Sequence, residues 1–323
     1  MDKSEIKQMF QKEGLNVQQV MFRSGDVRCA GDLYLPDDIQ RAGSVPGLVI
    51  GHSGGMVKEA LVVFARYFVN AGYVVLAIDY RTFGASEGEP RGQMFPEKQV
   101  EDFRSAISYL QTRPEVDPDR IGLWGVSMGG CVAIQTAVFD RRVKCVVCQS
   151  PSIVNGWRYM LKSSGQEQFK GLMDALEQDW KYRWETGEGA KVPLLNLQDD
   201  IASGYQAMAP ELFPTFRNET LLESMEHLLQ WVPEHFIEYL APTPLLMVAN
   251  GGYDPYHTLD EVQIAYRKAG EPKRLEVLPY DMMGLYMGQG QAEAMHLAIG
   301  WFDKYLRRGH LATRSAAAPS SIE

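Results

Sequence analysis

Gly125-Val126-Ser127-Met128-Gly129 has the spacing G-x-S-x-G and lies between two apolar segments. The run before it, Ile121-Gly122-Leu123-Trp124, has the length of a buried strand, and residues 130–138 have the pattern of a buried helix. A serine on such a sharp strand-to-helix turn exposes its hydroxyl above the sheet, at a helix N-terminus that favours developing negative charge. Ser127 is therefore the candidate nucleophile, provided that a base takes its proton.

Around this turn, strand-like runs alternate with helical patterns. Such alternation predicts an α/β fold with a mostly parallel, eight-stranded sheet flanked by helices on both faces. Ser24-Gly25-Asp26 joins the first two runs and is typical of a hairpin, so we expect an antiparallel leading edge. The eight predicted strands are Val17–Arg23, Val27–Leu35, Gly47–Gly51, Tyr73–Asp79, Ile121–Val126, Val143–Gln149, Pro244–Ala249 and Arg274–Leu278.

Residues 152–240 interrupt the alternation, because they contain no convincing core strand. We interpret them as a helical cap inserted into a core formed by residues 1–151 and 241–310, followed by a disordered tail at 311–323. The cap is rich in large side chains, which either form its own small core or line a large apolar substrate pocket.

Composition excludes several other classes of protein. The net charge of −9 and the lack of a Lys/Arg-rich run argue against a nucleic-acid partner. No apolar run reaches the roughly 18–20 residues of a membrane span, and the N-terminus lacks a signal-peptide core, so we expect a cytoplasmic protein. Cys145 and Cys148 lie three apart on a predicted strand and so point to opposite faces, which favours buried free thiols. We expect no cofactor and no metal.

Three further stretches carry a family resemblance: Gly51-His52-Ser53-Gly54-Gly55-Met56-Val57-Lys58-Glu59, Asp79-Tyr80-Arg81-Thr82-Phe83-Gly84-Ala85-Ser86-Glu87-Gly88 and Ala249-Asn250-Gly251-Gly252-Tyr253-Asp254-Pro255. With the G-x-S-x-G turn, they resemble the α/β-hydrolase superfamily over nearly the whole chain. The pattern is most similar to the dienelactone-hydrolase-like branch, which includes fungal hydrolases and polyketide transferases of secondary metabolism.

This resemblance implies roles for individual residues. The amides of Gly54 and Met128 would form the oxyanion hole, and Asp254 would be the acid of a catalytic triad in the order Ser, acid, His. Asp79 and Arg81 would pair with each other and fix their loop. His52 would pack within its loop and would not be the general base.

The expected catalytic histidine is missing from its usual place. The family often has G-H-x-D-x-Y after the last strand, where this chain has Tyr280-Asp281-Met282-Met283-Gly284-Leu285-Tyr286, so Met282 occupies the histidine position. Removing the histidine of a serine protease costs about 2 × 10⁶ in turnover, so a substitute is needed if Ser127 is acylated. His257 is one candidate, and Asp281 is another if it forms a carboxylate pair with Asp254.

Three functions follow from these alternatives. The first is acyl transfer from Ser127, by an esterase, thioesterase or polyketide acyltransferase. The second is a non-hydrolytic cyclase, isomerase, lyase or epoxide-opening enzyme that uses Asp254 and Asp281 for acid–base chemistry, and the third is a binding protein without turnover. We expect a large apolar acyl or polyketide-like substrate. Its predicted contacts are Met282, Trp157 and Tyr253. The acyl chain is either free or bound to a carrier, and a homodimer is one of the possible oligomeric states.

Overall fold

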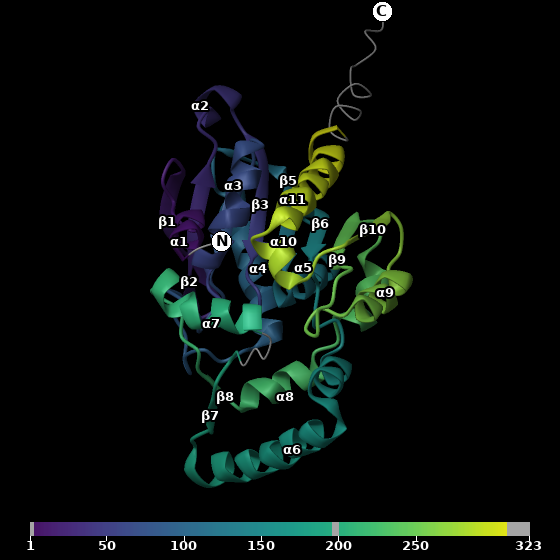
Figure 1. Ribbon diagram of the computed structural model, residues 1–323. Helices are drawn as coiled ribbons and strands as arrows, with labels where there is room; N and C mark the ends of the chain where they lie inside the picture. The colour runs from purple at the N-terminus through teal and green to yellow at the C-terminus, as the bar shows by residue number, and fades with distance from the viewer. Residues whose placement is uncertain (1–2, 196–199, 309–323) are drawn as a thin grey trace, which may run out of the picture.

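A computed structural model describes residues 3–195 and 200–308 (Figure 1). Its main sheet has eight strands in the order β1-β2-β4-β3-β5-β6-β9-β10. β2 is antiparallel to both of its neighbours, and the other pairs are parallel. This arrangement is the α/β-hydrolase fold, which confirms the predicted fold class.

All eight predicted strands are present, within a few residues of their predicted ends. Ser24 pairs with Val27, so only Gly25 and Asp26 form the turn between the first two strands, as predicted. The strands are β1 (Asn16–Ser24), β2 (Val27–Leu35), β3 (Val45–Gly51), β4 (Val74–Ile78), β5 (Val116–Val126), β6 (Val143–Gln149), β9 (Leu245–Asn250) and β10 (Lys273–Leu278).

Helices cover both faces of this sheet, and each face has its own apolar core. One core contains residues of α3 (Val62–Asn70) and α11 (Gln289–Phe302), which lie in front of the sheet in Figure 1. The other contains residues of α4 (Pro96–Gln111), α5 (Met128–Phe139) and α9 (Leu259–Lys268). Cys145 belongs to the first core and Cys148 to the second, so the two thiols are buried on opposite faces, as predicted.

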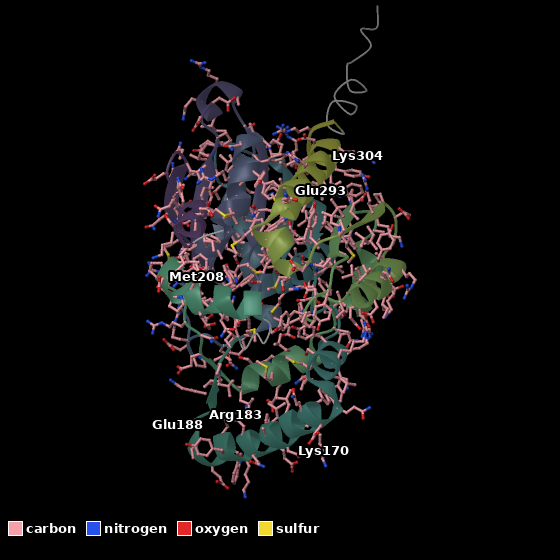
Figure 2. All side chains as sticks on the ribbon, viewed as in Figure 1. Lys170, Arg183, Glu188, Met208, Glu293 and Lys304 are labelled. Atoms are coloured by element: carbon pink, nitrogen blue, oxygen red, sulfur yellow. The ribbon has the colours of Figure 1, made fainter. Side chains whose placement is uncertain are left out.

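The chain between β6 and β9 is mainly helical. In Figure 2, Lys170 and Arg183 mark α6 at the end of the molecule opposite to Lys304 of the C-terminal helical segment. The elements of this part are α6 (Gly156–Thr186), β7 (Lys191–Val192), α7 (Asp200–Leu212), β8 (Thr220–Leu221), α8 (Glu223–Gln230), η2 (Pro233–His235) and η3 (Ile237–Leu240). The short strands β7 and β8 pair with each other and not with the main sheet.

Two small cores hold this helical part. Phe169 and Leu176 of α6 pack with Leu222 and Leu229 near or within α8. A different cluster joins the α7 region to the main body: Ala209, Phe213 and Phe216 pack against Met56, Val57 and Ala60. Because α7 shares a core with the residues that follow β3, the predicted division into core and separate cap stays a prediction.

The remaining elements are short. They are α1 (Lys3–Met9), α2 (Ile39–Ala42), η1 (Lys58–Leu61), α10 (Met282–Tyr286) and the π-helical segment η4 (Asp303–Arg308). None of the described helices combines the length and the apolar character needed to cross a membrane. The predicted tail at 311–323 lies outside the described residues.

The strand-to-helix turn at Ser127 is packed without spare room. A Cβ atom on Gly129 would lie 2.4 Å from the carbonyl oxygen of His52, and one on Gly125 would lie 2.2 Å from the backbone of Gly129. Both contacts are with backbone, which cannot rotate away as a side chain can. Because Gly125 and Gly129 have no side chains, the end of β5, the start of α5 and the loop after β3 can pack in direct backbone contact.

We predict that Gly129→Ala lowers the free energy of unfolding by at least about 3 kcal/mol, because the new methyl group meets backbone atoms. Gly171→Ala is the control, since Gly171 is exposed on α6 and a methyl group added there would have no neighbouring atom within 4 Å. That change should stabilise the protein by about 0.5–1 kcal/mol. Denaturant unfolding of both variants measures the difference, and equal effects would contradict the packing argument.

Candidate active site

Ser127 adopts a backbone conformation that non-glycine residues rarely have. Its φ is 57° and its ψ is −124°, and it immediately precedes the first residue of α5. Its amide donates to the carbonyl of Gln149 at 2.9 Å, which ties the turn to the end of β6. Such strain costs about 1–3 kcal/mol and persists only where the surroundings impose it. This conformation of the backbone directs the Ser127 hydroxyl toward the carboxyl ends of the strands.

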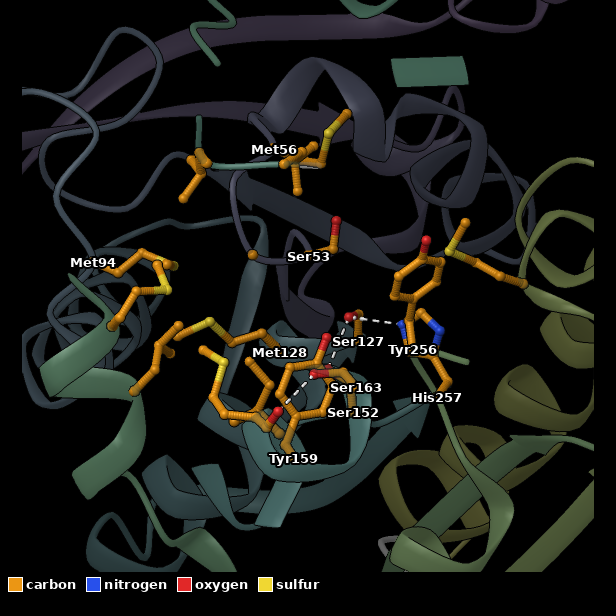
Figure 3. A pocket seen from close by; sticks show the side chains of 18 of the residues that line it. Ser53, Met56, Met94, Ser127, Met128, Ser152, Tyr159, Ser163, Tyr256 and His257 are labelled. Atoms are coloured by element: carbon orange, nitrogen blue, oxygen red, sulfur yellow. Dashed lines mark hydrogen bonds between the residues drawn. The ribbon is translucent and has the colours of Figure 1, made fainter. Parts of the chain in front are cut away.

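His257 is the histidine that the structure brings to Ser127. Its Nε2 lies 2.9 Å from Ser127 Oγ, and its Nδ1 lies 3.0 Å from Asp254 Oδ2 (Figure 3). All three side chains are buried. Of the candidate bases that the sequence suggested, His257 is thus in hydrogen-bond contact with both the serine and the acid.

A tight turn after β9 explains how an acid and a histidine only three residues apart can face each other. Asp254 Oδ1 accepts hydrogen bonds from the amides of Tyr256 at 2.9 Å and His257 at 3.0 Å. An aspartate that bonds the backbone two residues ahead is a usual turn former. Here it folds the chain back, so that the imidazole of His257 reaches the second carboxylate oxygen of the same aspartate.

The charge state of Asp254 fits this geometry. Burial alone would raise the pKa of its carboxyl group, but the nearby His257 and the hydrogen bonds from its ring and from two amides lower the pKa overall. Asp254 therefore remains an anion at neutral pH and accepts a hydrogen bond from His257 Nδ1. A histidine protonated at Nδ1 presents the lone pair of Nε2 to Ser127.

Gly54 and Met128 lie side by side near Ser127. Both line the same cavity as Ser127, and a Cβ atom on Gly54 would touch the Met128 side chain at 3.4 Å. Met128 is the first residue of α5, so its amide has no carbonyl partner one helical turn back. An oxyanion hole formed by the amides of Gly54 and Met128 stays a prediction.

The loops beside this site are fixed by two ion pairs, which differ from the predicted pair of Asp79 with Arg81. Asp79 accepts from the amide of Lys58 at 2.7 Å and from its ammonium group at 3.0 Å. Arg81 instead donates to the buried carboxylate of Asp102 at 2.8 and 2.9 Å. The prediction was wrong about the partners because each ion pair joins a residue of the motif to one outside it. Lys58 directly follows the loop that carries Gly54, so its pairing with Asp79 holds that loop in place.

A cavity of about 670 Å³ opens next to Ser127. Figure 3 shows Met56 and Met94 on its walls, with Ser127 between His257 and Ser152. The described lining residues include no aspartate, glutamate, lysine or arginine. They are Ser53, Gly54, Met56, Met94, Ser127, Met128, Ser152, Ile153, Tyr159, Met160, Ser163, Ser164, Gln168, Leu194, Leu195, Tyr205, Met225, Leu228, Tyr256, His257, Met282 and Tyr286.

Met282, one of the three predicted substrate contacts, lines this cavity. The other two lie elsewhere: Tyr253 is 86% exposed, and Trp157 is 49% exposed and packs against Phe169. Both predictions rested on the expectation that large side chains near an active site line its pocket. The structure corrects this, since neither is among the described residues that line the cavity.

Asp281 does not form the predicted carboxylate pair. It is exposed, and its Oδ1 accepts from the amide of Gly284 at 2.7 Å, which caps the N-terminus of α10. Both oxygens of Asp254 are bonded within its own turn. The pair was expected from closeness to the vacant histidine position, but a short helix begins there and uses Asp281 as its cap.

Two hydroxyl groups beside the nucleophile were not anticipated from the sequence. Ser152 Oγ lies 3.0 Å from Ser127 Oγ, and Tyr286 Oη lies 3.4 Å from His257 Nε2. Burial holds the pKa of Tyr286 well above its usual value, so the phenol keeps its proton. Neither residue belongs to a motif that predicted a catalytic role. Tyr286 could have been found as the tyrosine on which the family pattern was aligned.

Fold and geometry together define an α/β-hydrolase with a serine, histidine and aspartate in contact. The family described as serine aminopeptidase, S33, matches residues 44–280. The chain belongs to this family, whereas the dienelactone-hydrolase-like branch stays a prediction.

Individual relatives agree with this assignment. The chain is 32% identical to thiohydrolase aneE of Aspergillus aculeatus over 262 residues, which cover 77% of this chain and 80% of that protein. It is 27% identical to polyketide transferase grgF of Penicillium sp over 242 residues, covering 72% and 79%. Hypothetical protein PA2218 of Pseudomonas aeruginosa has a similar crystal structure, with a TM-score of 0.80, 26% identity and coverage of 92% and 96%. The chain is a hydrolase or acyltransferase enzyme.

His52 is buried against Tyr80, with its Nδ1 2.8 Å from the carbonyl of Ser53, so it packs within its loop as expected. Burial lowers the pKa of His52 to about 4. In the unfolded chain the pKa of a histidine is near 6.5, so between about pH 6.5 and 4 this histidine is protonated in the unfolded state and neutral in the folded state. The stability due to neutral His52 is complete above about pH 6.5 and is lost as the pH falls toward 4.

We predict that His52→Phe flattens the fall in unfolding free energy between pH 6.5 and 4 by about 3 kcal/mol relative to the unaltered protein. His296→Gln is the control, because His296 is exposed on α11. Urea unfolding at a series of pH values measures both slopes. A His52→Phe slope equal to that of the unaltered protein would show that His52 is protonated in the folded state.

Proposed function

We propose that this enzyme transfers acyl groups through Ser127, with His257 as general base and Asp254 as the acid that orients it. The observation that carries the proposal is the unbroken chain of contacts from Ser127 Oγ through His257 to Asp254, at 2.9 and 3.0 Å. These lengths are within the reach required of a nucleophile and its base.

The proposed reaction has two halves, acylation of Ser127 and transfer of the acyl group to an acceptor. Ser127 Oγ attacks the acyl carbon while its proton passes to His257 Nε2, and the amides of Gly54 and Met128 hold the resulting oxyanion. The bond to the leaving group then breaks, and the leaving thiolate or alkoxide takes the proton from His257. An acceptor, water or an alcohol, next gives its proton to His257 and attacks the acyl-enzyme, and Ser127 leaves with that proton.

The uncharged cavity favours a neutral acyl chain as the substrate. A peptide with a free amino terminus would need an anion to meet its ammonium group, and the described lining residues include no carboxylate. Methionines are frequent among these lining residues: Met56, Met94, Met128, Met160, Met225 and Met282. Methionine adapts its shape to irregular apolar ligands.

The names of the relatives narrow the proposed substrate further. They include a thiohydrolase and a polyketide transferase, so we propose a thioester of a polyketide-like chain as the acyl donor. Tyr159 and Tyr205 line the cavity as well and offer hydroxyl groups to oxygen substituents along such a chain. A carrier-bound donor is compatible with this proposal.

The non-hydrolytic alternative loses its basis in this geometry. It required Asp254 and Asp281 to act together, but Asp281 caps α10 and Asp254 is occupied by His257. Met282, which stands where the family pattern places the histidine, contributes to the wall of the cavity. The general base is proposed to come instead from the turn after β9.

We predict that Ser127→Ala and His257→Ala each lower the turnover of a short acyl thioester by about 10⁶-fold, and that Asp254→Asn lowers it by about 10⁴-fold. A fluorophosphonate probe should label the unaltered protein at Ser127 and leave Ser127→Ala unlabelled. Failure to label folded, unaltered protein under conditions that label a known serine hydrolase would refute the proposed nucleophile.

Asp281→Asn separates the two candidate acids, because it keeps the shape of the side chain and removes its charge. We expect its turnover to stay within about twofold of the unaltered enzyme, since asparagine also caps helices. Thioester hydrolysis by purified Asp281→Asn and Asp254→Asn measures the contrast. If Asp281→Asn were as inactive as Asp254→Asn, the result would support the mechanism in which Asp254 and Asp281 act together.

A further inference from the structure

The hydroxyl of Ser152 touches the atom that the proposed mechanism makes reactive. Ser152 lies between the end of β6 and the start of α6, and it is only 4% exposed. Its Oγ is 3.0 Å from Ser127 Oγ, on the cavity side of the nucleophile (Figure 3). No other hydrogen bond of this hydroxyl is found among residues 3–195 and 200–308. A buried hydroxyl whose partner is the nucleophile is a candidate for a chemical role.

The protons carried by His257 and Ser127 determine which of the two serines donates this hydrogen bond. Asp254 is ionised and accepts a hydrogen bond from Nδ1, and a neutral imidazole with its proton on Nδ1 offers a lone pair at Nε2. Ser127 carries one proton and lies 2.9 Å from Nε2, closer than the competing phenol of Tyr286 at 3.4 Å. Ser127 therefore donates to His257. Since its proton is used there, the contact with Ser152 must have Ser152 as donor and Ser127 as acceptor.

The backbone around Ser152 holds it in this position. The amide of Ser150, just after β6, donates to Val248 of β9 at 2.7 Å, while the amide of Ser127 donates to Gln149. Backbone hydrogen bonds from Ser152 and Ile153 reach the buried Cys131 thiol of α5, whose pKa burial nevertheless raises to about 12. Ser152 is thus anchored to the same strand ends and the same helix that position Ser127.

We propose that Ser152 is a further catalytic residue, which donates a hydrogen bond to Ser127 Oγ throughout the acyl-transfer cycle. This inference rests on the proposed function. In the resting enzyme the bond occupies one lone pair of Ser127 Oγ. When the acyl-enzyme breaks down, Ser127 Oγ leaves with developing negative charge, which the Ser152 hydroxyl stabilises while His257 returns the proton.

The size of the effect follows from the charge on the acceptor. A hydrogen bond to a charged group is stronger than one between neutral groups, and loss of such a bond corresponds to roughly a 10-fold to 100-fold change in rate. Because charge on Oγ develops when it attacks and when it leaves, both acylation and deacylation should slow.

The test uses a matched set of substitutions at one position. Ser152→Ala removes the hydroxyl, Ser152→Thr keeps it, and Ser152→Val has the shape of threonine without it. Threonine and valine have the same shape, so any crowding at this buried position affects both variants alike. Burst kinetics with a short-chain p-nitrophenyl ester give the acylation and deacylation rate constants, and thermal unfolding reports any loss of folding.

We predict that Ser152→Ala and Ser152→Val lower both rate constants by about 10-fold or more, while Ser152→Thr stays within about threefold of the unaltered enzyme. Rate constants for Ser152→Ala within twofold of the unaltered enzyme, or equal values for Ser152→Thr and Ser152→Val, would overturn the inference. A fluorophosphonate probe distinguishes this failure from that of the proposed function: labelled Ser127 with an unaffected Ser152→Ala refutes only the role of Ser152, whereas unlabelled Ser127 refutes both.

Discussion

Close backbone contact at Gly125 and Gly129 is the constraint on which the rest of the site depends. Without Cβ atoms at these two positions, β5 can turn directly into α5 and the loop after β3 can lie against the start of the helix. The turn gives Ser127 its unusual conformation and places Met128, the first residue of α5, next to Gly54. One steric requirement thus sets the positions of both Ser127 and Met128 relative to the loop after β3.

The turn after β9 supplies both partners of the serine from one loop. Asp254 bonds two backbone amides with one oxygen and the His257 ring with the other. An acid and a base held by one short turn keep their relative orientation even if neighbouring loops move. From the segment after β10, Met282 and Tyr286 of α10 line the cavity.

Sequence patterns predicted the strands well because buried parallel strands are short apolar runs with clear turn signals, as at residues 121–126. Ser127 and Asp254, which His257 connects in the structure, were likewise predicted from motifs of consecutive residues, as was the still untested oxyanion hole of Gly54 and Met128. The contact of His257 with Ser127 was only one candidate among several, because it joins residues 130 positions apart through a turn that no local motif revealed. For the same reason the sequence did not reveal Ser152 and wrongly placed Trp157 and Tyr253 in the cavity. The direction in which a side chain points depends on tertiary packing.

The cavity and the triad constrain the chemistry in different ways. The triad is suited to any acyl carbon that can accept a serine oxygen, so it says little about the substrate. The described cavity wall, with many methionines and hydroxyls and no charged side chain except where His257 ionises, disfavours charged chains because their desolvation would be uncompensated. It favours a flexible, neutral chain with scattered oxygen atoms, since methionine follows its shape and hydroxyls bond its oxygens. These cavity walls come partly from the helical part of the chain, with Tyr159, Met160 and Ser163 on α6 and Tyr205 on α7, whereas Ser127 and His257 lie at the ends of strands of the main sheet.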